Sequence, residues 1–580
     1  MDTVKVTIDR KTVEVGSGST VLEAAEKAGV QIPTLCQHPD QSIKANCRVC
    51  VVEVEGSRVL QPACAFPVSD GMVIGTRTPK VLEARRTVVE LLLAHHPQDC
   101  LICERNTRCD LQDITHELGI RDVAFPRDER HLPIDDSSGA VVRDPDKCIN
   151  CRRCIEACTV TQGIGILSTV NRGYDSVVST GLNRSLTDVP CVLCGQCIQV
   201  CPVGALREKD DTDRVWQALA DPQKHVVVQT APAVRVALGE DLGMPLGSSN
   251  TKRMVTALRR LGFDRVFDTD FTADLTILEE GHELLSRIKN GGKLPMMTSC
   301  SPGWIKFMEH YFPDLLDHLS TCKSPQQMFG ALAKTYYPEK AGVDPSQVFS
   351  VSVMPCTAKK FEANRPEMNS SGYTDVDAVL TTRELAQMIT QAGIDFSALP
   401  EEEYDSPLGI STGAAVIFGA TGGVMEAALR TVYEVVTGKE LANLDFEAVR
   451  GMEGIRKATV TLELPDDGGA LDVKVAIAHT LSQARELMEL VRSGKEELHF
   501  IEIMSCPGGC IGGGGQPRPT TNEVRRSRSK AIYGEDQGMT LRKSHENPAV
   551  KTLYEEFLKE PLGEKSHHLL HTKYSPRSLY

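Results

Sequence analysis

The stretches 148–158 (CINCRRCIEAC) and 191–202 (CVLCGQCIQVCP) decide how the N-terminal part of this 580-residue chain folds. Both have the spacing CxxCxxCxxxC, typical of a small domain that holds two 4Fe-4S clusters. Three closely spaced thiolates bind one cubane, and the fourth cysteine of each run completes the other. We therefore predict one cluster at Cys148, Cys151, Cys154 and Cys201, and a second at Cys158, Cys191, Cys194 and Cys197. Zinc is the alternative, but zinc sites rarely use two runs of this form.

A second group of cysteines lies upstream, where apolar and polar residues alternate as in β-strands. The strand-like segments are VKVTID (4–9) and VVEVEG (51–56), and the cysteines are Cys36, Cys47, Cys50 and Cys64. A CxxC pair flanked by one early and one late cysteine is typical of a plant-type 2Fe-2S site, although the first gap is longer here than in the plant pattern. We predict a 2Fe-2S cluster, with a zinc ribbon as the alternative.

A third group, in HHPQDCLICERNTRC (95–109), offers only Cys100, Cys103 and Cys109. A cubane with three thiolates needs a fourth donor, which an imidazole nitrogen can supply. His96 precedes this CxxC motif and is the ligand we predict, with neighbouring His95 as the competing assignment. One histidine among thiolates makes a cluster less negative and raises its potential. The first 210 residues are thus similar to the N-terminal part of the large iron–sulfur subunit of respiratory complex I.

The bulk composition argues against two classes of partner. The chain is 41% apolar and 24% charged, with a formal charge of −14, which does not favour nucleic acid or an anionic membrane. The first ten residues alternate like a strand and lack the regions of a signal peptide. The uncharged stretch 409–425 is interrupted by glycines, so we expect a buried, turn-rich segment rather than a transmembrane helix. The basic run RRSRSK (525–530) is expected to be a solvated loop.

The chain contains twenty cysteines and shows no secretory signal, which indicates a reducing compartment; we expect a cytoplasmic protein that binds metal. After residue 210 apolar strands alternate with amphipathic helices such as TKRMVTALRRLG (251–262). The predicted strands end in small residues or cysteine, as in KHVVVQTAP (224–232), KLPMMTSC (293–300) and VFSVSVMPC (348–356). This alternation predicts an α/β domain with its chemistry at the strand ends.

Three segments of this domain, TSCSPGW (298–304), MPCTAKK (354–360) and SCPGGCIGGGGQ (505–516), resemble the signature segments of the FeFe hydrogenases. The resemblance covers essentially the whole chain, and the first segment departs from the family at one position. It implies oxidation of dihydrogen or reduction of protons at an H-cluster. That cofactor is a 4Fe-4S cubane bridged by a cysteine to a diiron unit with CO, cyanide and azadithiolate ligands.

The resemblance also implies a multidomain α+β and α/β architecture. We divide the chain into a β-grasp 2Fe-2S ferredoxin-like domain (1–80), a His/Cys3 4Fe-4S domain (81–138), a two-cluster 4Fe-4S ferredoxin domain (139–210) and a large α/β H-cluster domain (211–580). This division predicts one 2Fe-2S cluster and three accessory 4Fe-4S clusters besides the H-cluster.

Several residues match functional positions of the family. They are the cubane ligands Cys356, Cys506 and Cys510, of which Cys510 bridges to the diiron unit, the cyanide donor Lys359, the distal-iron neighbour Gln326, and the pocket-lining Ala231, Pro232, Met354 and Met504. A cationic donor facing an anionic acceptor is sound chemistry for Lys359. The glycines of 505–516 allow the backbone to approach the cluster and to direct N–H groups at its sulfurs.

A row of titratable residues lies on the predicted helix TILEEGHELLSRIKN (276–290). Glu280, Glu283 and Arg287 share one face because they stand at positions i, i+3 and i+7. The pattern alone favours a solvated face. These positions match the family's proton path, together with Ser320 and Cys300, and we therefore predict a proton route.

The departure from the family lies at residue 301. The common family pattern has two adjacent cysteines, a proton donor and then a cubane ligand, and an ungapped match places Cys300 on the donor and Ser301 on the ligand. Serine is a poor replacement, because its hydroxyl ionises less readily than a thiol and oxygen is a hard ligand. We predict ligation by Ser301. The alternatives are ligation by Cys300, with an altered proton path, or by Cys322, which we otherwise expect to be a small buried thiol.

The electron partners are inferred from resemblance. No GxGxxG follows a strand, so we do not expect this chain itself to bind NAD(P). The segments LGEDLG (238–243) and 542–574 resemble the catalytic subunit of multimeric, NAD(P)-linked, electron-bifurcating hydrogenases. That implies a flavin- and NAD(P)-binding subunit, a small 2Fe-2S subunit and ferredoxin. The alternatives are a monomeric ferredoxin-linked hydrogenase and a non-catalytic iron–sulfur assembly protein. His567 and His571 have the spacing of a metal pair, but we expect a structural role.

Overall fold

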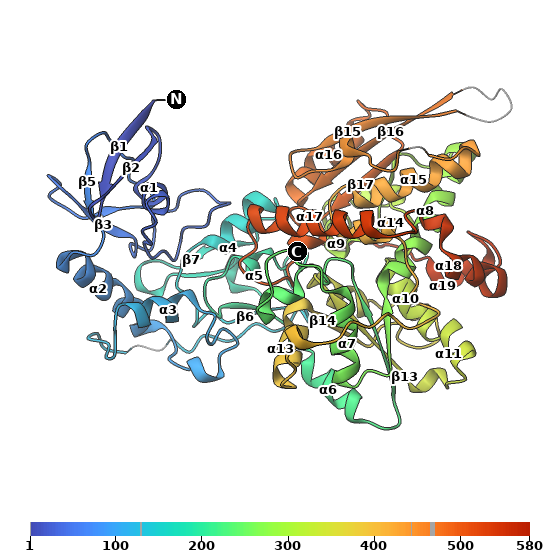
Figure 1. Cartoon of the computed structure of the whole chain (residues 1–580), viewed down its shortest axis with the longest axis horizontal. Coiled ribbons are helices and arrows are strands. Elements are labelled where there is room, and N and C mark those ends of the chain that lie inside the picture. The colour runs from blue at the N-terminus through green and yellow to red at the C-terminus, as the bar shows by residue number, and fades with distance from the viewer. Residues whose placement is uncertain (1, 128–129, 442, 464–469, 580) are drawn as a thin grey trace.

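The computed structural model describes residues 2–127, 130–441, 443–463 and 470–579, and Figure 1 shows an N-terminal part beside a larger C-terminal part. The N-terminal part begins with a five-stranded sheet in the order β2-β1-β5-β3-β4. β1 (Thr3–Ile8) is antiparallel to β2 (Lys11–Gly16) and parallel to β5 (Val73–Gly75). β3 (Val51–Val54) and β4 (Gln61–Pro62) complete the sheet, and α1 (Val21–Lys27) buries its apolar face against it. The two predicted strands are confirmed.

Short elements carry the cysteine-rich segments that follow. They are α2 (Pro79–His95), α3 (Asp110–Glu117), β6 (Val141–Arg143), α4 (Arg153–Glu156), β7 (Leu167–Val170), β8 (Val177–Thr180), α5 (Gln196–Gln199) and β9 (Leu206–Glu208). β6 pairs with β9 and β7 with β8, both antiparallel. Most of their cysteines belong to a hydrophobic cluster that continues into Ala358 and Phe361 of the C-terminal part. The two parts of the chain therefore share a core.

The C-terminal part contains two four-stranded sheets. The first has the order β11-β10-β13-β14, all parallel, with β11 (Arg265–Asp268), β10 (His225–Thr230), β13 (Val348–Met354) and β14 (Ala378–Thr381). The second has the order β12-β17-β16-β15, with β12 (Met296–Met297), β17 (Phe500–Met504), β16 (Ala470–His479) and β15 (Arg456–Glu463). Only β15 of this sheet is antiparallel to its neighbour.

Helices pack against both sheets. They are α6 (Thr212–Ala220), α7 (Thr251–Leu261), α8 (Thr269–Asn290), α9 (Pro302–Tyr311), α10 (Pro325–Ala333), α11 (Tyr336–Ala341), α12 (Ala358–Ala363), α13 (Thr382–Gln391), α14 (Gly413–Val416), α15 (Gly423–Thr437), α16 (Leu481–Ser493), α17 (Asn522–Gly538), α18 (Pro548–Leu553) and α19 (Glu564–Leu570).

Strand β10 shows how the sequence specifies this layering. Its neighbouring residues Val227 and Val228 are both fully buried, but they belong to different hydrophobic clusters. Val228 packs with residues of α6, α7 and α13, and Val227 packs with residues of α8, α10 and α18. A continuous apolar run is expected for a parallel strand covered on both faces. The predicted α/β domain is confirmed.

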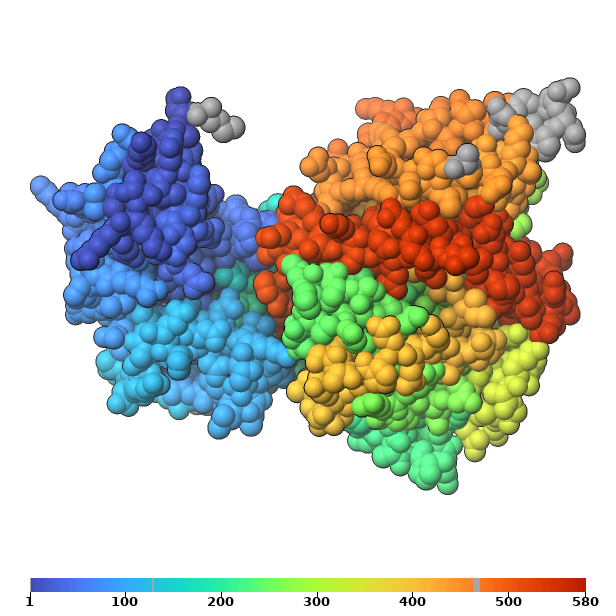
Figure 2. All heavy atoms as spheres, viewed as in Figure 1, coloured from blue at the N-terminus to red at the C-terminus, as the bar shows by residue number. Residues whose placement is uncertain are grey.

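Two further expectations have different outcomes. The stretch 409–425 is buried and turn-rich, as predicted, and contains α14 and the start of α15. The expectation of a solvated loop at 525–530 is wrong, because the run lies inside α17, with Arg525 and Arg528 buried. Figure 2 shows α17, in red, lying across the front of the C-terminal part. A membrane crossing would need a longer apolar run than any helix in the described part of the chain provides.

Candidate active site

A cavity of about 80 Å³ lies where the carboxyl ends of the two sheets meet. The segments that line it follow β10, β12, β13 and β17 directly. In parallel α/β sheets the loops beyond the carboxyl ends of the strands form the usual ligand site. The residues predicted for the H-cluster all line this cavity: Ala231, Pro232, Cys300, Ser301, Gln326, Met354, Cys356, Lys359, Met504, Cys506 and Cys510. Cys322 packs instead with Phe267 and Phe329 in a separate hydrophobic cluster.

The polar groups on the cavity wall fit an inorganic cofactor. Lys359 Nζ donates to Glu362 Oε2 at 2.8 Å, and Gln326 Nε2 donates to the same oxygen at 3.1 Å. Gln326 Oε1 is buried and has no protein partner. A buried acceptor without a partner, beside a lysine and several thiols, is unlike an apolar pocket that stays dry. Apart from residue 301, the side chains present fit the H-cluster.

Residue 301 differs from the other proposed ligands in its contacts. Ser301 Oγ lies 2.7 Å from Ser505 Oγ, so the two hydroxyls already form a hydrogen bond. The neighbouring thiol has a different environment. Burial and the nearby Glu280 carboxylate raise the pKa of Cys300 above its ordinary value, and both effects favour the protonated thiol.

The glycine-rich segment 505–516 forms one wall of the cavity. Gly508 and Gly509 have φ angles of +76° and +92°, which residues with a β-carbon rarely adopt. At Gly514 a side chain does not fit for a different reason, which is the closeness of a neighbouring backbone. A β-carbon there would lie 2.5 Å from the carbonyl oxygen of Cys194. The loop therefore packs backbone to backbone against the second CxxCxxCxxxC run.

Buried side chains donate to the carbonyl groups of this loop. Arg528 Nη1 donates to the Ile511 oxygen at 2.8 Å, and Arg383 Nη2 donates to the Gly514 oxygen at 2.8 Å. Arg528 also pairs with Glu240, with 2.6 Å between Nη2 and Oε2. A loop without regular structure leaves buried carbonyls that need such partners. The basic run of α17 thus binds the active-site loop, which is why it is buried rather than solvated.

The two cysteine runs surround two smaller cavities. Cys148, Cys151, Cys154 and Cys201 line a cavity of about 20 Å³, and Cys158, Cys191, Cys194 and Cys197 line another of about 30 Å³. The fourth cysteine of each run therefore lies with the first three of the other, as the spacing predicts. Cys194 lines both the second of these cavities and the central one.

The remaining N-terminal ligand candidates also converge in part. The pKa of Cys36 is lowered because the thiols of Cys47 and Cys64 hydrogen-bond to it, which places these three sulfurs together, and Cys50 hydrogen-bonds to Cys64. The His96 ring has a buried Nδ1 without a hydrogen-bond partner, and burial lowers its pKa to about 4. A neutral ring with an unused nitrogen suits a metal ligand.

His95 and the last group of cysteines have different surroundings. The His95 ring makes an edge-to-face contact with Tyr174, with 4.0 Å between the ring centroids. Of the three cysteines in the segment 95–109, Cys100 is exposed, Cys103 is half-buried and Cys109 is buried. These contacts favour His96 over His95 as the fourth donor to that group.

The predicted proton route is a buried chain of hydrogen bonds. Ser299 Oγ donates to Glu280 Oε1 at 3.2 Å. Ser320 Oγ donates to Glu283 Oε2 at 2.9 Å and also contacts Glu280. Arg287 Nη2 donates to Glu283 Oε1 at 2.6 Å and is partly exposed. The solvated face favoured by the helical pattern alone is wrong, because Glu280 and Glu283 are both buried.

The carboxyl in the middle of this chain can carry a proton at neutral pH. Burial, followed by repulsion from Glu283, raises the pKa of Glu280 to about 7. A carboxyl group with this pKa is protonated in a large fraction of molecules at neutral pH, and a group poised near the working pH transfers protons in both directions.

Comparison with known proteins identifies the fold and its cofactor type. Residues 224–514, half of the chain, match the iron only hydrogenase large subunit, C-terminal domain. The chain belongs to the iron-only hydrogenases. It is an oxidoreductase with iron–sulfur domains ahead of its hydrogenase domain. Residues 1–79 match a 2Fe-2S iron-sulfur cluster binding domain, 85–124 the NADH-ubiquinone oxidoreductase-G iron-sulfur binding region, and 139–207 the ferredoxin-like domain of NADH-quinone oxidoreductase subunit 3.

Individual hydrogenases resemble the chain over most of its length. It is 53% identical to the NADP-reducing hydrogenase subunit HndD of Solidesulfovibrio fructosivorans, over 100% of both chains. It is 40% identical to iron hydrogenase 1 of Clostridium pasteurianum, over 96% of this chain and 97% of that one. A solved structure of a variant of FeFe-hydrogenase HydA1 from Chlamydomonas reinhardtii matches 63% of this chain and 99% of its own, with 43% identity and a TM-score of 0.57.

The last match was not predicted from the sequence. Residues 522–577 match the iron hydrogenase small subunit, whereas the predicted division of the chain places them in the H-cluster domain 211–580. This segment contains α17, α18 and α19. It packs against the backbone of the proton chain, since the Tyr574 hydroxyl donates to the main-chain carbonyl oxygen of Ser320 at 3.0 Å.

Gly514 provides a test of the packing that holds the hydrogenase loop. We expect Gly514→Ala to lower the thermal midpoint and expose the junction with the N-terminal part to protease, because the added methyl group meets backbone and overpacking costs about 1–3 kcal/mol. Gly534→Ala in α17 is the matched control. Nothing lies within 4 Å of its new methyl group, and a helical alanine is favoured by about 1 kcal/mol. Equal midpoints for the two variants would contradict the proposed close contact.

Proposed function

We propose that this chain catalyses reversible oxidation of dihydrogen and reduction of protons in the central cavity. The observation that carries the proposal is the convergence of Cys356, Cys506, Cys510, Lys359 and Gln326 on one cavity at the strand ends. When bound there, the H-cluster would supply the iron centre that takes up or releases dihydrogen. The family membership reported above supports the same reaction.

The chain's own residues would hold this cofactor and position its surroundings. Cys356, Cys506 and Cys510 would bind the cubane, with Ser301 as the fourth ligand. Lys359 lines the cavity and donates to Glu362, and a cyanide ligand would be a second acceptor for its ammonium group. The apolar side chains of Met354 and Met504, with Ala231 and Pro232, would exclude water from the centre.

Protons would pass along the buried chain described above. Cys300 would give up or receive the proton at its Sγ, and Glu280 would exchange it through Ser299 and Ser320. Glu283 would connect this chain to Arg287 near the surface. The raised pKa of Glu280 supports the proposal, because a carboxylate ionised at every working pH could not hold the proton.

Electrons would reach the cavity through four accessory clusters. We propose one 2Fe-2S cluster at Cys36, Cys47, Cys50 and Cys64, one 4Fe-4S cluster with His96 as a ligand, and two cubanes in the paired cysteine runs. Cys194 lines both the cavity of the second cysteine run and the central cavity. This supports an order in which the cubane of that run passes electrons to the central site. We retain the division at residues 80, 138 and 210 as part of this proposal.

We further propose that the chain works in a multimeric cytoplasmic enzyme linked to NAD(P) and ferredoxin. Identity of 53% over the whole length with a subunit named as NADP-reducing supports this. The partners would be a flavin- and NAD(P)-binding subunit and a small 2Fe-2S subunit. A non-catalytic iron–sulfur assembly protein is less consistent with the site, since a cubane alone does not need Lys359, Gln326 or the two methionines.

Purification of the native protein without oxygen tests both proposals. We expect infrared bands of CO and cyanide, dihydrogen turnover with an artificial dye, and a copurifying flavin subunit that allows NAD(P)-dependent turnover. Absence of the bands and of turnover after competent maturation would exclude the hydrogenase reaction. A single polypeptide that reduces ferredoxin at full rate would exclude the multimeric assembly and leave the hydrogenase proposal intact.

Substitutions at residues 300 and 301 separate ligand from proton donor. We expect Cys300→Ala to lose turnover by about 10²–10⁴-fold, as for loss of an acid–base group, while its iron content and cubane resonance signal are unchanged. Ser301→Cys is expected to keep the cubane, and Ser301→Ala to weaken it. Loss of about four iron atoms in Cys300→Ala, with none lost in Ser301→Ala, would identify Cys300 as the ligand.

Glu280→Gln tests the proton route. We expect a loss of about 10²–10⁴-fold in turnover at unchanged iron content, because the amide cannot carry the proton. In the unsubstituted enzyme, proton reduction should fall as the pH rises through about 7, since Glu280 is protonated below this pKa and ionised above it.

Glu502→Gln is the matched control for this test. Burial likewise raises the pKa of Glu502 to about 7, but its two carboxylate oxygens accept from the backbone N–H groups of Gly422 and Met425 and not from the relay hydroxyls. We expect turnover within about threefold of the unsubstituted enzyme. Equal losses in the two variants would show that the effect of Glu280 is structural.

A further inference from the structure

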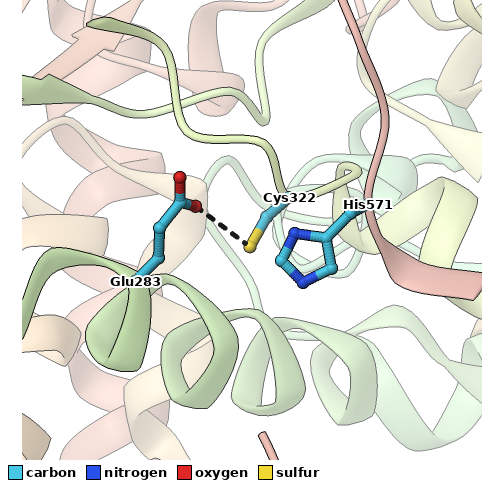
Figure 3. Close-up of side chains that lie close together, drawn as sticks. All are labelled: Glu283, Cys322 and His571. Atoms are coloured by element: carbon cyan, nitrogen blue, oxygen red, sulfur yellow. Dashed lines mark hydrogen bonds between the residues drawn. The ribbon is translucent and has the colours of Figure 1, made fainter. Parts of the chain in front are cut away.

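Beside the proton chain, three side chains from distant segments face one another. Glu283 lies on α8, Cys322 follows β12 and α9 in the chain, and His571 follows α19 in the small-subunit segment. Figure 3 shows the three side chains converging, with one ring nitrogen of His571 on the side of the Cys322 sulfur. From the sequence, Cys322 is expected to be a small buried thiol and His571 to have a structural role, and neither residue lines the central cavity.

The spacing of the three donor atoms suits a small divalent cation. One ligand atom from each residue lies within 4.8 Å of the other two. The Glu283 Oε2 and Cys322 Sγ atoms are 3.8 Å apart. Oxygen and sulfur ligands on one tetrahedral zinc ion lie about 3.5 Å apart, given metal–ligand distances of about 2.0 and 2.3 Å. Small side-chain shifts would therefore bring the three atoms onto one ion.

The His571 ring is held in the orientation that a metal ligand requires. Its Nε2 lies 3.2 Å from Glu279 Oε2, and Tyr554 fixes the other oxygen of that carboxylate at 2.5 Å. The carboxylate accepts, so Nε2 carries the proton and Nδ1 the lone pair. That lone pair now accepts from the Thr321 hydroxyl at 2.8 Å. A carboxylate behind a histidine is the usual support of a zinc-binding imidazole.

The charges around the cluster also favour a cation. Glu279, Glu280 and Glu283 are buried carboxylates on one helix. Arg287 pairs with Glu283 Oε1 at 2.6 Å, so Oε2 is the oxygen that faces Cys322. A thiol, an imidazole and a carboxylate together select zinc or cadmium over magnesium and calcium, which prefer oxygen ligands only. The ring of the exposed His567 lies at a tilt beside that of His571, with 4.3 Å between ring centroids, and provides an approach from the surface.

We propose that Glu283, Cys322 and His571 form a binding site for Zn²⁺ or a similar soft divalent cation, and that occupation of this site stops proton transfer through Glu283. The ion would take the carboxylate oxygen that now accepts from Ser320, so Glu283 could no longer take up a proton. Binding releases the Cys322 proton to solvent as the thiolate forms. The proposal that the site binds zinc is argued from the donor geometry alone. The proposal that bound zinc inhibits turnover rests on the proposed function.

The first test is direct. The mature enzyme is incubated with one equivalent of Zn²⁺, desalted, and measured by X-ray absorption at the zinc edge, which the cluster iron does not obscure. We expect one sulfur at about 2.3 Å and nitrogen or oxygen at about 2.0 Å. Cys322→Ser should remove the sulfur shell, and His571→Gln should lower zinc retention at least about tenfold. An unchanged sulfur shell in Cys322→Ser would overturn the site.

The controls separate this site from others on the chain. Glu434, His545 and Glu546 form a second group with suitable spacing, so His545→Asn serves as the matched variant and should leave the sulfur shell intact. Iron content and visible absorption of each variant show that its clusters are retained. Should Cys322→Ser fold poorly, Cys322→Ala and His571→Asn give the same two readouts.

The second test is inhibition, normalised for each protein to its own rate without zinc. We expect Zn²⁺ to inhibit turnover, a chelator to restore it, and Cys322→Ala to raise the half-inhibitory concentration at least about tenfold. Inhibition of Cys322→Ala at the same zinc concentration as the unsubstituted enzyme would overturn the proposal that zinc at this site inhibits turnover. Undiminished turnover in enzyme that holds zinc through sulfur would overturn it as well. A fully matured protein that shows no dihydrogen turnover before zinc is added, but binds zinc through sulfur, would contradict the proposed function and leave the binding site supported.

Discussion

The structure depends on close contact between two backbones. The loop 505–516 carries two of the proposed cubane ligands, and at Gly514 it approaches the Cys194 carbonyl so closely that no side chain fits. This contact joins the sheet-based C-terminal part to the second cysteine run. It also sets the position of the cavity, because the last residues of β13 and β17 line the cavity together with this loop. A larger residue at position 514 would push the second cysteine run away from the loop that carries the proposed cubane ligands.

Buried charges follow from that contact. A loop with few internal hydrogen bonds presents carbonyl groups in a water-poor interior, and each needs a donor. Arg383, Arg528 and Gln199 supply donors to the Gly514, Ile511 and Gly513 oxygens. The arginines in turn need carboxylates, and Glu240 pairs with Arg528. The small-subunit segment therefore contributes to the active-site wall as well as to the surface.

Much of the fold and of the site could be predicted from the sequence, because local spacing encodes local geometry. Cysteine spacing predicted which thiols share a cavity, and apolar runs predicted the parallel strands. Partners far apart in the chain could not be predicted. Arg528 and Glu240 are separated by 288 positions, so the run 525–530 resembled a solvated loop. The roles of Ser299, Ser505 and Glu362 as hydrogen-bond partners in the site were also not predicted, because a single serine or glutamate lies in no sequence pattern that indicates a buried contact.

The shared position of Cys194 has an energetic consequence. The second accessory cavity and the central cavity both include this residue in their linings, so centres bound in them would lie close together in a medium of low dielectric constant. An electron stored on one centre would then repel an electron arriving at the other. Their reduction potentials would not be independent, and a redox titration would report values that belong to the pair. The last step of electron delivery would thus depend on how many electrons the protein already holds.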